Sequence, residues 1–235
     1  MLSKLRLTFL AAALLLTSQI FAHAIWIETD LNAVKGKNHT AKVFFGEYGG
    51  NERDTVANWF SDLNKLSVWL VTPGGEKKQL EAKPTLTAID VDFTPETDGI
   101  YKLLIYHVVK DLHGKAKIEY NASATIVAGK AAKEAANSNE VALQWNAEKA
   151  VNIHKALPLT VLVNGKPAKE PVEIVLPGTE GQKFTSDEKG LVTFTPAKPG
   201  KYMVEIMHND KVEGTHNDKP YTSVWKIATE CIDVK

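Results

Sequence analysis

The chain contains the segment Phe93-Thr94-Pro95, then Gly99-Ile100-Tyr101, and then the run Leu103-Leu104-Ile105-Tyr106-His107. The same pattern returns 101 residues later as Phe194-Thr195-Pro196, Gly200-Lys201-Tyr202 and Ile206-Met207-His208. At the same offset, Tyr120 and Ile126 recur as Tyr221 and Ile227. Chance matches would not keep one register over so long a stretch. The chain therefore contains two copies of one unit.

Each copy begins a strand with the pattern Gly-x-Tyr. Tyr101, Leu103 and Ile105 alternate with other residues and so share one face of a strand. Tyr202 begins the matching strand of the second copy. This pattern resembles the tyrosine corner of immunoglobulin-like sandwiches, in which the tyrosine hydroxyl bonds back to upstream backbone.

Short alternating runs separated by turn residues predict further strands. We expect them at 25–29, 41–46, 66–72, 86–93, 100–109 and 117–127, and at 141–145, 159–163, 172–176, 182–185, 191–195, 201–208 and 221–231. The absence of a long helical period predicts an all-β protein of two tandem immunoglobulin-like or transthyretin-like β-sandwich domains. The expected division is an N-terminal domain at 23–128, an Ala/Lys/Glu-rich linker at 129–140 and a C-terminal domain at 141–235.

The first residues have the layout of a secretory signal peptide. Lys4 and Arg6 precede an apolar run at 7–16, and a more polar run ends in Ala22. Removal of residues 1–22 would leave His23 first, whereas cleavage after Ala24 also satisfies the small-residue rule and would leave Ile25 first. The apolar run is too short to span a membrane, and no later run is long enough. We therefore expect a periplasmic or secreted protein with no transmembrane segment in the mature chain.

Composition excludes several function classes. Removing Lys4 and Arg6 lowers the basic residues from 28 to 26 against 28 acidic residues, a net charge of 26 − 28 = −2, so no basic field for nucleic acid remains. The one cysteine, Cys231, cannot form an intrachain disulfide and is expected to be a small buried residue. The chain has no Gly-x-Ser-x-Gly nucleophile motif and no phosphate-binding glycine loop, and we expect no enzymatic activity.

The seven histidines are the candidate metal ligands. Imidazole suits nickel, cobalt and copper, but no local histidine spacing here is diagnostic. In a sandwich, His23 at the start of the first strand and His107 at the end of the penultimate strand lie at one end, and His208 takes the matching place in the second unit. If His23 became the amino terminus, its α-amine and ring would together form a bidentate ligand. The alternative is that His107 and His208 are core residues whose rings bond to backbone carbonyls.

The stretch Ala22-His23-Ala24-Ile25-Trp26-Ile27-Glu28 is similar to the opening of the DUF4198 family. Phe45-Gly46-Glu47-Tyr48, Val163-Asn164-Gly165-Lys166-Pro167, Pro199-Gly200-Lys201-Tyr202 and Tyr221-Thr222-Ser223-Val224-Trp225 are similar to later segments of that family. The family's Glu-Pro after the tryptophan is Glu28-Thr29 here. The resemblance implies a bacterial periplasmic component associated with nickel or cobalt uptake, with His23 and His208 at matching positions.

Three functions remain as hypotheses. The first is a periplasmic protein that binds or delivers nickel, cobalt or copper through His23, with His107 or His208 as a further ligand and a membrane transport component as partner. The second is a non-enzymatic β-sandwich module that binds protein or glycan, since fold alone does not choose a partner. The third is a copper oxidoreductase with a histidine brace, which would need a second brace histidine beside His23.

Overall fold

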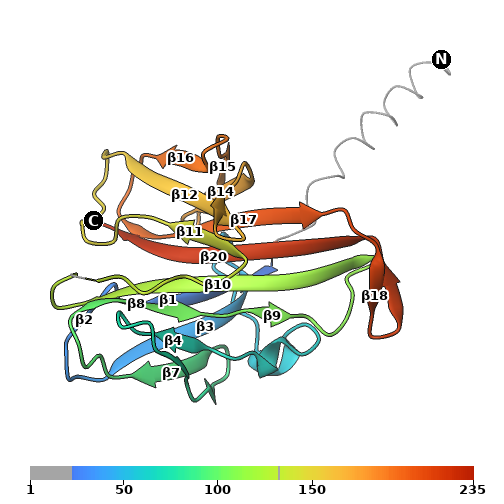
Figure 1. The fold of residues 1–235 in the computed structure, drawn as a ribbon, viewed down its shortest axis with the longest axis horizontal. Coiled ribbons are helices and arrows are strands. Elements are labelled where there is room, and N and C mark those ends of the chain that lie inside the picture. Colours follow the sequence, from blue (N-terminus) through green and yellow to red (C-terminus); the bar gives the residue numbers. More distant parts are fainter. Residues whose placement is uncertain (1–22, 132) are drawn as a thin grey trace.

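Alternation of apolar and polar residues gives the chain strands along its whole described length. The computed structural model describes residues 23–131 and 133–235, and the ribbon is drawn in Figure 1. The expected all-β fold class is confirmed, because the only helices in these residues are the 3-10 turns η1 (Val56–Asn58) and η2 (Leu63–Lys65). Neither turn has the length or apolar character of a membrane span. The predicted signal peptide lies outside the described residues.

The strands follow the predicted order closely in both halves. Those of the first half are β1 (His23–Thr29), β2 (Asn32–Ala33), β3 (His39–Glu47), β4 (Trp69–Val71), β5 (Lys77–Gln79), β6 (Lys83–Pro84), β7 (Ile89–Phe93), β8 (Gly99–Leu104), β9 (His107–Val108) and β10 (Ala116–Ala128). Those of the second half are β11 (Val141–Gln144), β12 (Leu157–Val163), β13 (Lys166–Pro167), β14 (Pro171–Val175), β15 (Gln182–Thr185), β16 (Leu191–Phe194), β17 (Gly200–Asp210), β18 (Gly214–His216), β19 (Lys219–Tyr221) and β20 (Ser223–Val234).

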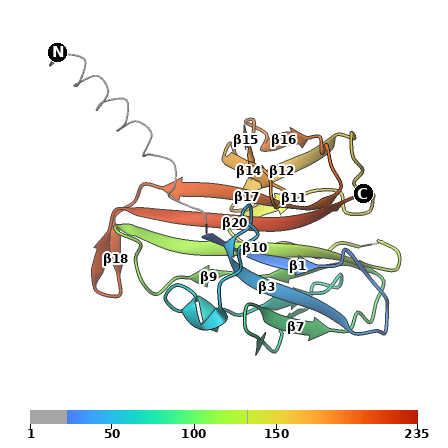
Figure 2. The ribbon, with the colours of Figure 1, turned by 180° about the vertical axis from the view of Figure 1, so that it is seen from behind.

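The strands are arranged in three layers (Figures 1 and 2). The central sheet has the order β15-β14-β17-β20-β10-β8-β4-β5, and β2 and β9 also pair with β10. The first outer sheet, β1-β3-β7-β6, packs on one face of it. The second outer sheet, β11-β12-β13 with β16 beside β12, packs on the opposite face. Two apolar cores therefore lie on the two sides of one sheet.

The central sheet joins the two halves of the chain. The last strand of each repeat pairs with the other in parallel, from Ala116 opposite Ser223 on β10 and β20 to Ser123 opposite Glu230. Two separate tandem sandwiches are therefore not confirmed, although the division at 128 and 141 stays a prediction. The pairing removes an exposed strand edge from each half. It also places equivalent ends of the two repeats at the same end of the sheet.

The tyrosine corner is present in both repeats. The Tyr101 hydroxyl donates to the Thr97 carbonyl at 2.8 Å and accepts the Thr97 N–H at 3.0 Å. The Tyr202 hydroxyl donates to the Lys198 carbonyl at 2.9 Å. Each tyrosine thus fixes the turn that precedes its own strand, β8 or β17, as the Gly-x-Tyr pattern predicted.

The segment expected to be a linker lies against the central sheet. The Ile100 N–H donates to the Lys133 carbonyl at 2.8 Å, and the Ala135 N–H donates to the Ile100 carbonyl at 2.9 Å. Gly99 permits this approach, because a Cβ at its φ of +142° would lie 2.8 Å from the Lys133 carbonyl oxygen. The buried amide of Asn139 donates to two further backbone carbonyls of the first half. Residues 133–139 are therefore part of the packed structure.

Candidate functional site

His23 lies at the amino end of β1, which is an edge strand of the first outer sheet. Its side chain is 46% exposed, and its Nε2 lies 3.5 Å from Oδ2 of Asp54. The imidazole packs on Phe45 with ring centroids 5.5 Å apart. The His23 carbonyl accepts a long hydrogen bond of 3.4 Å from the Tyr120 hydroxyl. The ring is thus held by a carboxylate and an aromatic face while solvent still reaches it.

The loop after β3 brings Asp54 to this histidine. The Glu52 N–H donates to the Glu47 carbonyl at 2.9 Å, and the Asp54 N–H donates to the Phe45 carbonyl at 2.9 Å. Gly46 is required at the start of the loop, because a Cβ there would clash with the Glu52 carbonyl oxygen. The tight return of the chain therefore depends on a residue without a side chain.

Trp26 helps to hold this loop in place through Glu28 and Arg53. It is fully buried, and its Nε1–H donates to Oε1 of Glu28 at 2.8 Å. The same Glu28 oxygen pairs with the Arg53 guanidinium at 2.8 Å, and that guanidinium lies 4.7 Å from the Phe44 ring centroid. A cation over an aromatic face adds to the ion pair. Trp26 is thus a core anchor.

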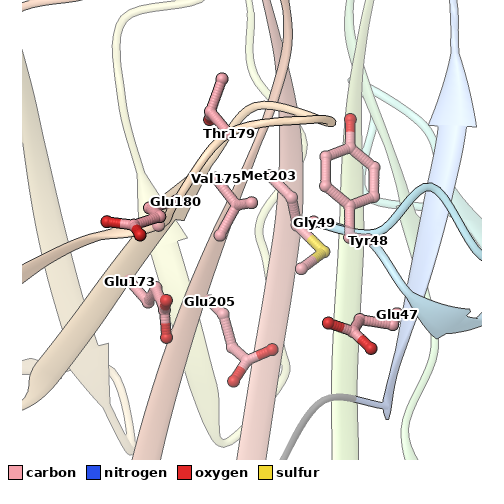
Figure 3. Close-up of a pocket in the computed structure, with 10 residues that line it drawn as sticks. Glu47, Tyr48, Gly49, Glu173, Val175, Thr179, Glu180, Met203 and Glu205 are labelled. Atoms are coloured by element: carbon pink, nitrogen blue, oxygen red, sulfur yellow. The ribbon is translucent and has the colours of Figure 1, made fainter.

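A cleft of about 300 Å³ is drawn in Figure 3. One residue of its lining, Glu47, is the cross-strand partner of His23. The residues that line it come from the end of β3, from β14 and β17, and from the loop after β14: Glu47, Tyr48, Gly49, Glu173, Val175, Thr179, Glu180, Gly181, Met203 and Glu205. Its floor is apolar, since Tyr48, Val175 and Met203 pack together there, with the partly buried Cys231 against them. Its polar lining includes four carboxylates.

Electrostatics make this cleft attractive to cations. Glu173 and Glu205 are directly opposite one another on β14 and β17. Burial, and then the nearby Glu173 carboxylate, raises the pKa of Glu205 to about 7. In Figure 3 the carboxylates of Glu47 and Glu205 face one another across the cleft. A cation bound between these carboxylates would offset both their mutual repulsion and the energetic cost of burying their charges.

His107 lies at the same end of the first half as His23, as the sandwich topology predicted. It is the cross-strand partner of Tyr120, whose hydroxyl contacts the His23 carbonyl. Its Nε2, however, lies 3.1 Å from Asp62. Although burial opposes the shift, the Lys110 N–H and His107 hold the pKa of Asp62 below its usual value. This histidine therefore has a carboxylate partner of its own and bonds to neither His23 nor a backbone carbonyl.

His208 sits in a separate ion-pair network on the central sheet. Its Nδ1 lies 2.7 Å from Glu170, and its Nε2 lies 3.0 Å from Asp210. The Lys226 ammonium lies 2.8 Å from the other oxygen of Asp210. Hydrogen bonding to Lys226, with the His208 charge, keeps the pKa of Asp210 low against the effect of burial. Both ring nitrogens and the carboxylates around them already have partners.

The three histidines predicted as candidate metal ligands each contact a different carboxylate. Within residues 23–131 and 133–235, no group of three or more His, Cys, Asp or Glu side chains is arranged to hold a metal ion. Sequence reasoning also missed Asp54 and the carboxylates of the cleft. The sequence did contain one sign of these carboxylates. Glu205 interrupts the apolar run Met203-Val204-Glu205-Ile206 and lies on the same face of the strand as Met203.

Solved structures that resemble the chain do so weakly. Salmonella alpha-2-macroglobulin reacted with methylamine is 10% identical, with a TM-score of 0.29, and the match covers 90% of this chain and 15% of that one. Trypsin-activated alpha-2-macroglobulin from Escherichia coli is also 10% identical, with a TM-score of 0.29, and 90% and 16% of the two chains are covered. A marsupial T cell receptor is 11% identical, with a TM-score of 0.25 and coverage of 92% and 73%.

The chain thus spans only a small part of the macroglobulins that it matches. No curated protein matches it. A family model described as a domain of unknown function, DUF4198, matches residues 20–210. That range contains β1, the loop that holds Asp54, both tyrosine corners and all three predicted histidines. The protein belongs to the DUF4198 family.

Proposed function

We propose that this is a periplasmic protein that binds a divalent transition metal at the amino end of β1 and delivers it to a membrane transport component. One observation carries the proposal: the half-exposed His23 ring is held by Asp54, and the cross-strand partner of His23, Glu47, lines an acidic cleft. The metals considered are nickel, cobalt and copper, which imidazole suits. The protein acts by binding and not by catalysis.

The contact with Asp54 assigns the two ring nitrogens different roles. Asp54 lies beside Nε2, which leaves Nδ1 as the nitrogen for a metal. A carboxylate on the second nitrogen of a metal-binding histidine fixes the ring and raises its basicity. After cleavage behind Ala22, the α-amine of His23 would bind beside Nδ1 in one chelate ring. Cleavage after Ala24 would remove His23 and with it the site.

The acidic cleft would attract metal cations to this part of the protein. Glu47 adjoins His23 across the sheet, and Glu173 and Glu205 extend the negative charge behind it. Clefts lined by charge of one sign raise the local concentration of oppositely charged ligands. Delivery requires release as well as capture, and a half-exposed ligand at a strand end suits exchange with a partner. His107 and His208 are left out of the proposed ligand set, because the His107 side chain is only 13% exposed and both ring nitrogens of His208 contact carboxylates.

Calorimetric titration of the exported protein with nickel, cobalt and copper tests the proposal. Intact mass first establishes whether His23 is the amino terminus. A version with one alanine added before His23 should bind at least about tenfold more weakly, because the amine leaves the chelate. His23→Ala should abolish binding, whereas His154→Asn removes an exposed imidazole elsewhere and should leave the affinity unchanged. Affinity should fall below about pH 7, since a free α-amine has a pKa of about 7.7–8.0.

Two results would contradict the proposal. Equal affinity with and without the extra alanine would remove the amine from the site. A protein with His23 at its amino terminus that binds none of the three metals would favour the non-enzymatic module for protein or glycan.

A further inference from the structure

A second cleft, of about 250 Å³, lies on the opposite face of the central sheet from the first outer sheet. It is bounded by Lys102 on β8, by Leu143 on β11 and Leu162 on β12, and by the docked segment Glu134–Asn137. Backbone hydrogen bonds between Ile100 and residues 133 and 135 hold that segment in place. The cleft is therefore built from fixed elements of both repeats.

Lys102 supplies a buried positive charge to this cleft. Its side chain is 2% exposed, and the residues on either side of it on β8 are buried and apolar. Its Nζ donates to the Thr125 hydroxyl at 2.8 Å and lies 3.3 Å from the Glu134 carboxylate. An ammonium carries three N–H donors, and burying one is costly unless acceptors surround it. Glu134 is 40% exposed, so its side chain can turn to solvent if another acceptor takes its place.

Asn137 supplies a second donor. Its Oδ1 accepts the Asn139 N–H at 3.1 Å, which fixes the orientation of the amide and directs Nδ2 away from that backbone. Nδ2 is buried, and no described residue accepts a hydrogen bond from it. Native proteins rarely leave a buried donor in this state, and such a group calls for an acceptor. Lys102 and Asn137 line the same cleft.

We propose that this cleft binds the carboxylate of a small aliphatic molecule, with Lys102 and Asn137 as donors. A carboxylate accepts only, and it accepts most strongly from a cation and an amide N–H together. Leu143, Leu162 and Ala135 supply apolar walls for a short hydrocarbon part. The volume suits a ligand the size of propionate or alanine and is below that of pockets for larger molecules. Glu134 in the lining repels anions of higher charge, such as phosphate.

A free carboxylic acid and an amino acid both carry the carboxylate and the short hydrocarbon part that this cleft would bind. The amino acid would place its ammonium against Glu134, which the free acid cannot do. Separate NMR titrations of the exported protein with propionate, L-alanine and inorganic phosphate distinguish them. We expect saturable shifts at residues that line the cleft with propionate or alanine and none with phosphate. If alanine binds more tightly than propionate, Glu134→Gln should remove the difference.

The decisive variant is Asn137→Asp, which keeps the oxygen that accepts the Asn139 N–H and replaces the donor by a carboxylate. It should weaken binding at least about tenfold, because a donor to a charged group becomes a repelling charge. Asn152→Asp makes the same change at an exposed position and should leave binding intact. Thermal melts of both variants show that they fold. Failure of both organic ligands to bind, phosphate binding of equal strength, or wild-type affinity in Asn137→Asp would each overturn the proposal.

Discussion

Glu173 and Glu205 lie directly opposite one another on the neighbouring antiparallel strands β14 and β17. Like charges in this position destabilise a sheet. Burial and the nearby Glu173 carboxylate together explain why the pKa of Glu205 rises to about 7. Both residues line the same cleft as Glu47, the cross-strand partner of His23.

This pair predicts how stability depends on pH. The folded protein holds the Glu205 proton up to about pH 7, while the unfolded chain releases it near 4.5. Because the unfolded state then binds fewer protons, the free energy of unfolding should fall as pH rises through that window. Glu205→Gln should match the wild type below pH 4.5 and exceed it above pH 7 by roughly 1–3 kcal/mol. Urea unfolding at pH 5 and pH 8 measures this.

Glu148→Gln is the matched control, because Glu148 is exposed and loses the same charge. Its unfolding free energy should follow the wild-type pH dependence. Parallel curves for Glu205→Gln and the wild type would show that folding does not change the pKa of Glu205 and would contradict its rise.

A buried carboxylate ties the second half to the central sheet. Glu230 is 1% exposed and accepts hydrogen bonds from the Trp145 indole at 2.8 Å, from the Ser123 hydroxyl at 2.7 Å and from the Thr125 hydroxyl. Glu230→Leu should cost about 3–5 kcal/mol, because it leaves these three buried donors without their acceptor. Glu230→Gln keeps an acceptor oxygen and should cost clearly less. Urea unfolding followed by tryptophan fluorescence compares the two, and equal losses would show that the bonds contribute nothing beyond packing.

The loop that carries Asp54 depends on Gly46. Gly46→Ala would place a Cβ against the Glu52 carbonyl, a backbone atom that cannot rotate away. Gly165→Ala is the control, since Gly165 has a φ of +71° and no atom near its added Cβ. The control should cost about 1 kcal/mol from backbone strain alone. Gly46→Ala should cost at least about 2 kcal/mol more by thermal or urea unfolding. Similar losses of unfolding free energy in the two variants would mean that the loop adjusts to the added methyl group without an energetic cost.

The local pattern of residues was enough to predict the main strands and the repeat. The alternation around Tyr101 and Tyr202 depends only on neighbouring residues, so the strand order and both tyrosine corners could be predicted. The pairing of β10 with β20 could not, because it joins residues about a hundred positions apart and either strand could have stayed at an edge. The cleft depends on that pairing, since it brings β14 and β17 beside the end of β3. Glu205 was visible as a charge in an apolar run, but its partner Glu173 was not.

The two tyrosine corners differ in a way that the repeat alone does not predict. The Tyr101 hydroxyl bonds to the carbonyl, the N–H and the side chain of Thr97, whereas among the described residues the Tyr202 hydroxyl bonds only to the Lys198 carbonyl. Both rings are buried, so removing either hydroxyl leaves polar groups without partners. Tyr101→Phe should therefore cost about 2–3 kcal/mol, and Tyr202→Phe about 1 kcal/mol. Because each change keeps the ring, packing cancels in the comparison. Urea unfolding of the two variants measures the difference, and a larger loss for Tyr202→Phe would show that the Thr97 bonds do not stabilise the turn before β8.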